Sequence, residues 1–586
     1  MIQLDEFFIK SKLYESVNSL VYRGVRKTDN LPVILKVLKE DYPTPAELTR
    51  YRQEYEIIDS LNLEGVITAY ELKEYQRTLI IVVEDFGGES LQTLIKVSGE
   101  IDCPMPLVEF LRLAIKITEI LGQIHSANVI HKDINPGNIV LNPETGQVKI
   151  IDFGISTRLT RTQPTLSQVN ILEGTLAYVS PEQTGRMNRS LDYRTDYYSL
   201  GVTFYELLTG QLPFTTTDFL ELVHCHIAQQ PIPAHELVGV NQHTPIPKTV
   251  SNLVMKLMAK TAEDRYQSAW GIVADLQECL LQLETTGQIN DFPIASRDIS
   301  DKFQIPQKLY GREAEVSRLL SAFERVVGNN EFLGLSSQLN EPIQNLRREM
   351  ILVAGYSGIG KSVLVAEIYK PITRQRGYFI SGKFDQFGRN SPYSAVVTAF
   401  TDLVRQLLTE NETDLNQWRE KILSALGSNG QVIVDVIPDV ELIIGKQPSV
   451  PELGLQEAKN RFSLVFKNFI GALSSCEHPL VIFLDDLQWA DAASLKLLQL
   501  IMTDSQINYL LVIGAYRDNE VKPTHPLMVT LDDLRQERVI IHQITLTPLR
   551  LAHVSQMIAD TLHRDIEAVH PLAELILQKT GGNPFF

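Results

Sequence analysis

The amino-acid sequence predicts a multidomain protein in which an α+β domain precedes an α/β domain built on a parallel sheet. Short β-like runs over residues 1–60, followed by apolar residues at helical spacing over residues 107–125, predict the first domain. Apolar strands that alternate with helical segments from residue 309 onward predict the second. Between these two patterns, the polar residues 284–308 are typical of a linker.

The composition is that of a globular protein, and it excludes several classes. Of the 586 residues, 44% are hydrophobic and 21% are charged, which rules out a wholly disordered or fibrous chain. The formal net charge of −17 argues against nucleic acid or a membrane as partner, because binding phosphates requires clustered Lys and Arg. Four scattered cysteines, an acidic N-terminus and the lack of an apolar run of about 18 residues predict a cytoplasmic protein.

The first domain carries a constellation of residues suited to phosphoryl transfer. Residues 131–138 have the sequence HKDINPGN, and a DFG sequence begins at Asp152, nineteen residues after Asp133. Asn138 and Asp152 offer oxygen ligands for Mg²⁺, which takes its other ligands from phosphate and water. Asp133 is expected to orient the attacking hydroxyl or to accept its proton.

Two charged residues upstream complete this constellation. Lys36 ends the strand-like sequence VILK and is expected to reach the α and β phosphates of ATP. Glu54 lies on the helix predicted over residues 46–61 and is expected to hold Lys36 by an ion pair. The predicted site is therefore assembled from residues far apart in the sequence.

These motifs, taken in chain order, resemble the eukaryotic-like protein kinase family over residues 1–283. The resemblance implies a bilobal fold, with ATP between the lobes and adenine bonded to the backbone near Glu84 and Phe86. It also implies a pair between Arg265 and Glu182. The sequence Gly-Thr at residues 174–175 is similar to the substrate-docking loop of Ser/Thr kinases, and the candidate phosphorylation sites are Thr157, Thr160, Thr162, Thr165 and Ser167.

The chain departs from this family in two places. Where the family carries three glycines in G-x-G-x-x-G, this sequence has Tyr14, Ser16 and Ser19, although backbone N–H groups must still approach the phosphates closely there. Asn135 occupies the catalytic-loop position of a Lys that steadies the transferred phosphate, and it brings no charge. Losing one such contact costs roughly 3 kcal/mol, or about a hundredfold in rate. A pseudokinase that binds ATP without transferring phosphate therefore remains an alternative.

The second domain contains a phosphate-binding loop. The sequence GYSGIGKS matches G-x-x-x-x-G-K-[ST], follows the strand MILVA and opens a helix with the sequence KSVLVAEIY. Gly355, Gly358 and Gly360 let backbone N–H groups surround the phosphates. Lys361 is expected to reach the β and γ oxygens, and Ser362 is expected to coordinate Mg²⁺.

The strand sequence VIFLDD supplies two carboxylates to the same site. Asp485 is expected to bind Mg²⁺ through water, and Asp486 stands where many ATPases place a water-polarising Glu. The shorter side chain of Asp486 predicts slow hydrolysis, which suits a switch. Arg517, after a later strand, is a candidate sensor of the γ-phosphate, with a surface Arg as the competing interpretation.

With the sequences YGRE and GNP at either end, these motifs resemble the AAA-related signal-transducing NTPases, the STAND class. The resemblance implies an ATPase core over residues 309–546 and the beginning of a helical lid over residues 547–586, in which Pro584 contacts the nucleotide base. An origin-recognition-like ATPase is a related interpretation, against which the acidic charge balance argues.

The order of the two domains is similar to the N-terminal half of large bacterial sensor kinases, so further C-terminal signalling modules are expected. The main hypothesis is an ATP- and Mg²⁺-dependent Ser/Thr protein kinase in intracellular signal transduction, coupled to a nucleotide-switch ATPase. Its partners would be protein substrates with Ser or Thr, including the chain itself. The alternatives are a pseudokinase scaffold, or a protein whose main activity is the ATPase and whose kinase lobe recognises partners.

Overall fold

The computed structural model describes most of the chain, and the described residues form two compact units, one largely before and one largely after residue 303. The described ranges are 6–16, 19–39, 43–75, 78–95, 104–158, 175–184, 191–216, 218–237, 245–298, 308–328, 347–386, 392–408, 412–451, 453–562 and 564–586.

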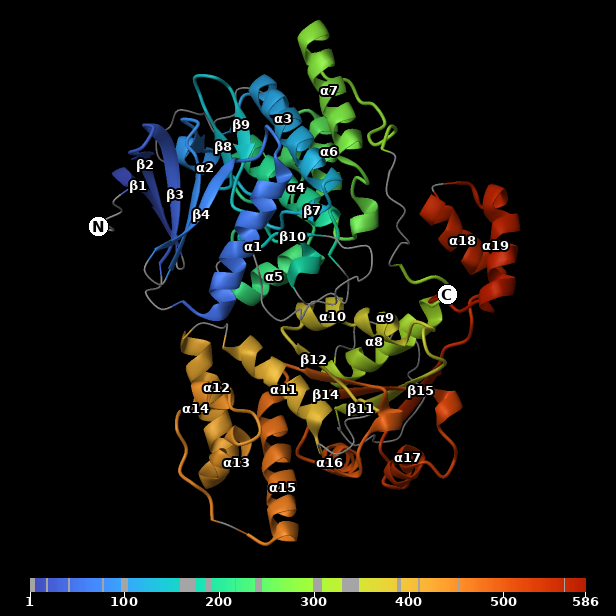
Figure 1. Ribbon diagram of the computed structural model, residues 1–586. Helices are drawn as coiled ribbons and strands as arrows, with labels where there is room; N and C mark the ends of the chain where they lie inside the picture. Colours follow the sequence, from blue (N-terminus) through green and yellow to red (C-terminus); the bar gives the residue numbers. More distant parts are fainter. Residues whose placement is uncertain are drawn as a thin grey trace. The chain divides into compact units, whose positions relative to one another are not determined.

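The first unit begins with a five-stranded antiparallel sheet in the order β1-β2-β3-β5-β4 (Figure 1). Its strands are β1 (Phe7–Glu15), β2 (Ser19–Arg26), β3 (Leu31–Leu38), β4 (Ala69–Tyr75) and β5 (Thr78–Glu84). Lys36 lies on β3, opposite Val21 of β2 and Ile81 of β5. β1 is the outermost strand on one side, and its register with β2 shifts twice, between Ile9 and Ser11 and between Lys12 and Tyr14.

One long helix, α1 (Pro45–Leu61), accompanies this sheet. It begins with a capping box, because the Thr44 side chain accepts the backbone N–H of Glu47 while Glu47 accepts the backbone N–H of Thr44. It ends at Asn62, whose φ of 37° lies in the left-handed region. The helix packs on β4 and β5, which carries Glu54 to the interior.

The rest of the first unit is mainly helical. Its longer helices are α3 (Leu107–Ser126), α4 (Arg194–Thr209), α5 (Phe219–Ala228), α6 (Lys248–Leu257) and α7 (Ala269–Thr286). Its short elements are β6 (Glu89–Ser90), α2 (Leu91–Thr93), β7 (Val129–Ile130), β8 (Ile139–Leu141), β9 (Val148–Ile150) and β10 (Thr157–Arg158). Phe110 of α3 and Phe204 of α4 are fully buried and meet edge to face, with ring centroids 5.4 Å apart.

The segment after α7 differs from the linker predicted over residues 284–308. α7 continues to Thr286, and the residues after it fold back onto the helical part. Asp298 accepts hydrogen bonds from the backbone N–H groups of Gln267, at 2.7 Å, and Ser268, at 2.9 Å, next to the start of α7. Polar composition alone did not reveal this docking, because the contacts are made by a few spaced residues.

The second unit contains a five-stranded parallel sheet in the order β12-β13-β14-β11-β15. Its strands are β11 (Arg348–Ala354), β12 (Tyr378–Lys383), β13 (Leu480–Asp485), β14 (Leu510–Tyr516) and β15 (Ile541–Thr545). Its helices are α8 (Glu313–Val327), α9 (Lys361–Ala366), α10 (Tyr369–Arg374), α11 (Ser394–Leu407), α12 (Glu412–Leu426), α13 (Gly430–Val434), α14 (Val440–Ile444), α15 (Leu455–Leu473), α16 (Ala492–Thr503), α17 (Pro526–Gln536), α18 (Leu551–Leu562) and α19 (Ile566–Thr580).

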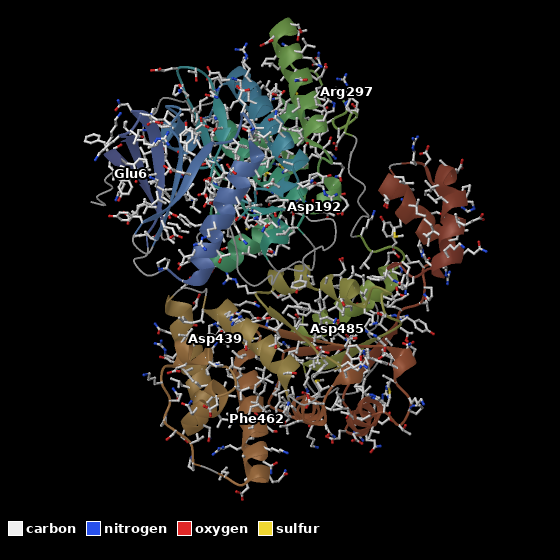
Figure 2. All side chains as sticks on the ribbon, viewed as in Figure 1. Glu6, Asp192, Arg297, Asp439, Phe462 and Asp485 are labelled. Atoms are coloured by element: carbon white, nitrogen blue, oxygen red, sulfur yellow. The ribbon has the colours of Figure 1, made fainter. Side chains whose placement is uncertain are left out.

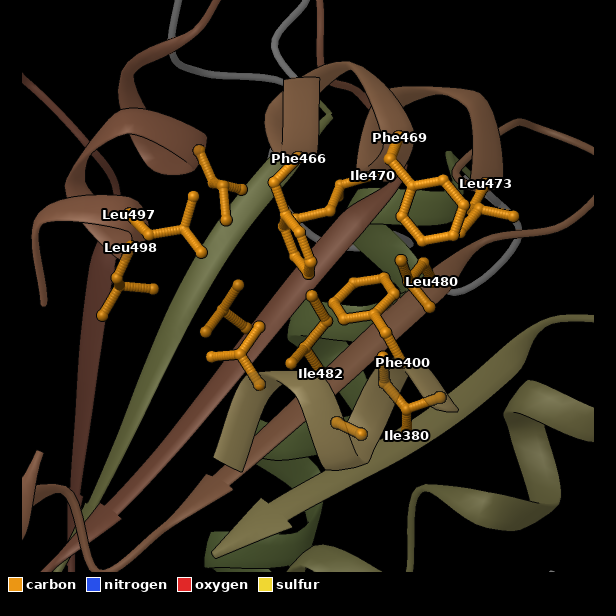
Figure 3. Close-up of a cluster of buried hydrophobic side chains, with 14 of the residues drawn as sticks. Ile380, Phe400, Phe466, Phe469, Ile470, Leu473, Leu480, Ile482, Leu497 and Leu498 are labelled. Atoms are coloured by element: carbon orange, nitrogen blue, oxygen red, sulfur yellow. The ribbon is translucent and has the colours of Figure 1, made fainter. Parts of the chain in front are cut away.

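Helices cover both faces of this sheet, as α/β proteins with buried parallel strands require. Residues of α8 to α10 pack against one face, and residues of α11, α15, α16 and α17 pack against the other. Figure 3 shows part of the core on the face covered by α11, α15, α16 and α17, where Phe400, Phe466 and Phe469 lie against Ile380 and Ile482 of the sheet. These observations confirm the predicted fold class of two different mixed domains.

The helix predicted from the sequence KSVLVAEIY is divided in two. α9 ends at Ala366, and α10 starts at Tyr369. Pro371 explains the interruption, because it has no N–H to donate to the carbonyl four residues earlier, and its ring crowds that carbonyl. Among the helices that the structure describes, none is long and apolar enough to cross a bilayer.

Candidate functional site

The first candidate site is a cavity of about 280 Å³ in the first unit. Lys36 of β3, Glu54 of α1, Asp133 after β7 and Asp152 after β9 all line it. The sheet and the helical part thus bring four predicted residues from distant parts of the chain to one place. Asp133 and Asp152 share this cavity, and Tyr14, which is 62% exposed, is not among its lining residues.

Lys36 lies between two carboxylates. Its Nζ donates to Glu54 Oε1 at 2.6 Å and to Asp152 Oδ1 at 2.8 Å. Burial alone lowers the pKa of Lys36, but Asp152 and Glu54 outweigh burial and hold that pKa above its ordinary value. Burial raises the pKa of Glu54 despite Lys36, whereas at Asp152 the effect of Lys36 exceeds burial and lowers the pKa. The lysine therefore remains charged in the cavity.

Both carboxylate oxygens of Asp133 accept hydrogen bonds. Oδ1 accepts the backbone N–H of Thr175 at 2.8 Å, and Oδ2 accepts Nδ2 of Asn138 at 2.9 Å. Because the amide nitrogen of Asn138 faces Asp133, its oxygen is left for another ligand. The backbone of Asn138 is also bonded to the DFG segment, since its backbone carbonyl accepts the backbone N–H of Ile151, next to Asp152, at 3.0 Å.

A buried aspartate shapes the loop that carries Asp133. Asp196 of α4 is fully buried and accepts the backbone N–H groups of His131, at 2.8 Å, and Lys132, at 2.6 Å. Lys132 has a φ of 70°, a strained conformation for a residue with a side chain. The charge-assisted bonds to Asp196 stabilise this conformation and so orient the next residue, Asp133.

Asn135 makes its contacts within the loop. Its Oδ1 accepts the N–H of Gly137 at 2.8 Å, and its Nδ2 lies 3.1 Å from the Asp133 carbonyl and 3.3 Å from Thr175 Oγ1. The side chain is 6% exposed. It therefore holds the backbone around Asp133 and supplies no positive charge.

The residues predicted near the adenine lie on β5 and just after it. The Glu84 carboxylate contacts the buried Nζ of Lys149 and accepts the N–H of Thr68 at 2.7 Å. The Phe86 carbonyl accepts Nδ2 of Asn142 at 2.7 Å. These bonds fix the connection between sheet and helical part, and adenine binding there stays a prediction. Thr160, Thr162, Thr165 and Ser167 lie outside the described residues.

Sequence reasoning missed three residues of α1 that line the same cavity, Glu47, Arg50 and Tyr51. Arg50 Nε donates to the carbonyl of Gly154 at 2.7 Å, which ties α1 to the DFG segment. Tyr51 contacts Ser19 and lies beside Lys36. The only available signal was spacing, because residues three and four positions before Glu54 share its side of a helix.

The second candidate site surrounds the loop between β11 and α9. Gly355, Gly358 and Gly360 have φ values of 150°, 77° and 99°, which residues with side chains rarely adopt. Lys361 is buried, and its Nζ donates to the carbonyls of Gly355, at 2.8 Å, and Tyr356, at 2.9 Å. Burial lowers the pKa of Lys361, against the opposing effect of Asp485. The loop thus has the backbone shape that phosphate binding requires.

The two predicted metal ligands of this site are neighbours. Ser362 Oγ donates to Asp485 Oδ2 at 3.3 Å, and Asp485, labelled in Figure 2, ends β13. Burial raises the pKa of Asp485, and Asp486 adds to that rise. A cation between this hydroxyl and carboxylate would reverse the effect, because it favours the charged carboxylate.

Asp486 and Arg517 contact each other. Asp486 is 4% exposed and accepts Nε2 of Gln488 at 2.8 Å. Arg517 Nε lies 3.4 Å from Asp486 Oδ1, and Lys383 Nζ lies 3.4 Å from its Oδ2. β14 lies between β11 and β13 in the sheet. Arg517 directly follows β14, and it therefore lies between the phosphate loop, which follows β11, and Asp485, which ends β13. In this arrangement the Asp486 carboxylate lies between two positively charged side chains.

Pro584 belongs to a segment that touches the phosphate loop. Nδ2 of the preceding residue, Asn583, donates to the Ser357 carbonyl at 2.9 Å. A side chain at Gly358 would come within 2.6 Å of Phe585. Pro584 itself is partly exposed. The structure therefore brings this segment and the loop together, as the predicted site requires.

Both sites fit the hard oxygen ligands of Mg²⁺ and the phosphates of ATP. In the first, the carboxylate of Asp152 lies 2.8 Å from the charged Lys36, and the side-chain amide of Asn138 contacts Asp133, which lines the same cavity. In the second, Ser362 and Asp485 adjoin the phosphate loop, and no described atom outside the neighbouring chain lies within 4 Å of where a side chain at Gly360 would begin, which leaves room for an anion there.

Two domain models match different parts of the chain. Residues 9–276 match the protein kinase domain model, and residues 330–513 match the AAA ATPase domain model. The chain is 32% identical to the serine/threonine-protein kinase PknB of Mycobacterium leprae, over 42% of this chain and 38% of that protein.

Larger relatives match across both domains. The chain is 30% identical to hybrid signal transduction histidine kinase G of Dictyostelium discoideum over 81% of its length, and 25% identical to histidine protein kinase 1 of Candida albicans over 67%. It covers 17% of the length of each of these two proteins. The chain therefore carries a protein kinase domain followed by an AAA ATPase domain.

Proposed function

We propose that the chain is an ATP-dependent Ser/Thr protein kinase of cytoplasmic signal transduction, coupled to a nucleotide-switch ATPase. One observation carries the proposal: Lys36, Glu54, Asp133 and Asp152 line a single cavity, with the Lys36–Glu54 ion pair already formed. Phosphoryl transfer depends mainly on positioning and charge neutralisation, and this geometry supplies both. The proposed kinase domain spans residues 1–283.

In this proposal each residue of the first site has one role. Lys36 binds the α and β phosphates and is oriented by Glu54. Asp152 and Asn138 would hold Mg²⁺, which supplies charge neutralisation at the phosphates when bound. Asp133 orients the acceptor hydroxyl and takes its proton, with its carboxylate aligned by Asn138 and Thr175. The N–H of Thr175 on Asp133 supports a Ser or Thr acceptor, including one on the chain itself.

The proposed role of the second domain is to bind ATP and hydrolyse it slowly. Lys361 would exchange the two loop carbonyls for phosphate oxygens, and Ser362 and Asp485 would hold Mg²⁺. The short side chain of Asp486 supports slow turnover, because it reaches less far toward an attacking water than the Glu that many ATPases place there. The proposed core is 309–546, with 547–586 as the lid, and further signalling modules are proposed on the pattern of the longer relatives.

The test is transfer of radiolabelled γ-phosphate to the chain itself and to a generic Ser/Thr protein substrate. Asp133→Asn is expected to abolish labelling, and Asp59→Asn, the same change at an exposed position of α1, is expected to retain it. Lys361→Ala separates the two ATP sites, since it should remove ATPase turnover while leaving the first site intact. Equal labelling by the wild type and Asp133→Asn would refute the kinase proposal.

The pseudokinase remains the second candidate, because two observations favour it. Asn135 brings no cation to Asp133, and the turn above the cavity has no glycine. A scaffold of this kind would bind ATP in the first site without any transfer. Two results together would establish that candidate instead. The Lys361→Ala variant would bind ATP and lose this binding when Lys36→Met is added, and the substrate would stay unlabelled.

A further inference from the structure

Ser16 and Ser19, just after β1 and at the start of β2, bond to each other through backbone and side chain. The backbone N–H of Ser16 donates to the Ser19 carbonyl at 2.9 Å, and the backbone N–H of Ser19 donates to Ser16 Oγ at 2.9 Å. Both residues line the first cavity. Reciprocal bonds of this kind stabilise a turn that glycine would leave free to sample other conformations.

The side chain of Ser19 points inward and makes a bond that glycine cannot make. It is 8% exposed, and its Oγ lies 2.5 Å from the hydroxyl of Tyr51, which is 5% exposed. The Tyr51 ring packs between Leu38 of β3 and Leu79 and Ile81 of β5. This hydrogen bond constrains the positions of both side chains, because either buried hydroxyl would lose its hydrogen-bond partner if the other were removed.

Tyr51 connects this bond to the catalytic ion pair. It precedes Glu54 by three residues on α1 and therefore shares its side of the helix. Its ring centroid lies 5.8 Å from Lys36 Nζ. Burial raises the pKa of Tyr51 to about 12, so its hydroxyl stays protonated. The turn, α1 and Lys36 are thus linked through one side chain.

We propose that Ser19 and Tyr51 are positioning residues whose hydrogen bond holds Ser16 and Ser19 at the nucleotide cavity and keeps Glu54 against Lys36. This inference rests on the proposed function of the first site. In a glycine-rich turn, the backbone can come close to the phosphates because no side chain is in the way. Here a hydrogen bond between two side chains holds the backbone in place instead. It follows that serine at position 19 is required in this chain, and that glycine there weakens ATP binding.

The test is a double-mutant cycle on ATP affinity. Affinity is measured by displacement of a fluorescent ATP analogue in full-length Lys361→Ala protein, so that only the first site binds. Ser19→Ala, Ser19→Gly and Tyr51→Phe are each expected to weaken ATP binding three- to tenfold, as loss of one net hydrogen bond predicts. The double variant Ser19→Ala/Tyr51→Phe should be no weaker than the single variants. Tyr55→Phe, on the partly exposed side of α1, is the matched control and should be unchanged.

Kinetics separate positioning from a merely structural role. KM for ATP is expected to rise three- to tenfold in each variant, with kcat within about twofold of wild type. Unchanged affinity in Ser19→Gly, additive losses in the double variant, or a fall in kcat alone would each overturn the inference. If Asp133→Asn showed that no phosphate is transferred, the proposed function would fail, and the affinity cycle would still decide whether the bond positions the nucleotide.

Discussion

Replacing Arg265 tests how strongly one buried ion pair stabilises the kinase domain. Arg265 and Glu182 are 1% and 3% exposed, and the guanidinium donates to both carboxylate oxygens, at 2.6 Å and 2.9 Å. Arg265 also donates to the carbonyls of Arg194, at 2.9 Å, and Ala259, at 2.8 Å. Arg265→Met keeps much of the volume but removes the charge, while Glu182, which also accepts a hydrogen bond from Thr195 Oγ1 at 2.8 Å, stays buried.

The expected loss is about 3–5 kcal/mol, because removing one partner leaves an uncompensated buried charge. For a domain of this size, that corresponds to a fall in melting temperature of roughly 10 °C. The double variant Arg265→Met/Glu182→Met should recover part of the loss, since it buries no unpaired charge. Arg112→Met is the matched control, because Arg112 and Glu284 form an exposed pair expected to contribute less than about 1 kcal/mol.

Differential scanning calorimetry of the full chain measures these changes, with the transition of the ATPase domain as an internal reference. A fall of less than about 2 °C in Arg265→Met would refute the reasoning, because it would mean that the buried carboxylate finds other compensation. A double variant less stable than Arg265→Met would contradict it as well.

Three further predictions concern single residues. Asn135→Lys should raise kcat for phosphorylation about tenfold or more by adding a cation near Asp133, and an unchanged kcat in steady-state assays would contradict this. Burial lowers the pKa of Lys260 to about 7, so the unfolded state binds more protons between pH 7 and 10; stability to urea should rise over that range, and Lys260→Met should abolish the rise. Arg517→Ala should slow ATP hydrolysis by the second domain about tenfold or more while ADP binding, measured by calorimetry, is retained.

The sequence predicted the architecture well because periodicity and local motifs determine it. Alternating strands and helices identified the parallel sheet, and helical spacing identified α3 within a residue or two of its ends. The helix after the phosphate loop was predicted too long, because its apolar pattern continues past Ala366, where α9 ends, to Tyr369 without a break. Four charged residues of the first candidate site, Lys36, Glu54, Asp133 and Asp152, were likewise predictable, since each belongs to a motif with characteristic spacing.

The contacts that join these motifs were not predictable. Ser19 and Tyr51 are thirty-two positions apart, and neither belongs to a motif that names the other as a partner. The pairing of Asp486 with Arg517 depends on the order of strands, which brings β14 between β11 and β13. Asp298 docks through backbone N–H groups, which leave no mark in the sequence. Interactions of this kind arise from tertiary packing and become visible only in the fold.

The outermost position of β1 has a consequence for how the molecule behaves at high concentration. The edge of a sheet offers N–H and C=O groups to a strand from a second chain. Burial of the exposed side chains of Phe8 and Leu13 would stabilise such pairing. The two register shifts of β1 increase its local twist, and Lys12 and Glu15 place charges along it. These features disfavour pairing between this edge and a strand of a second chain, although apolar side chains are exposed on β1.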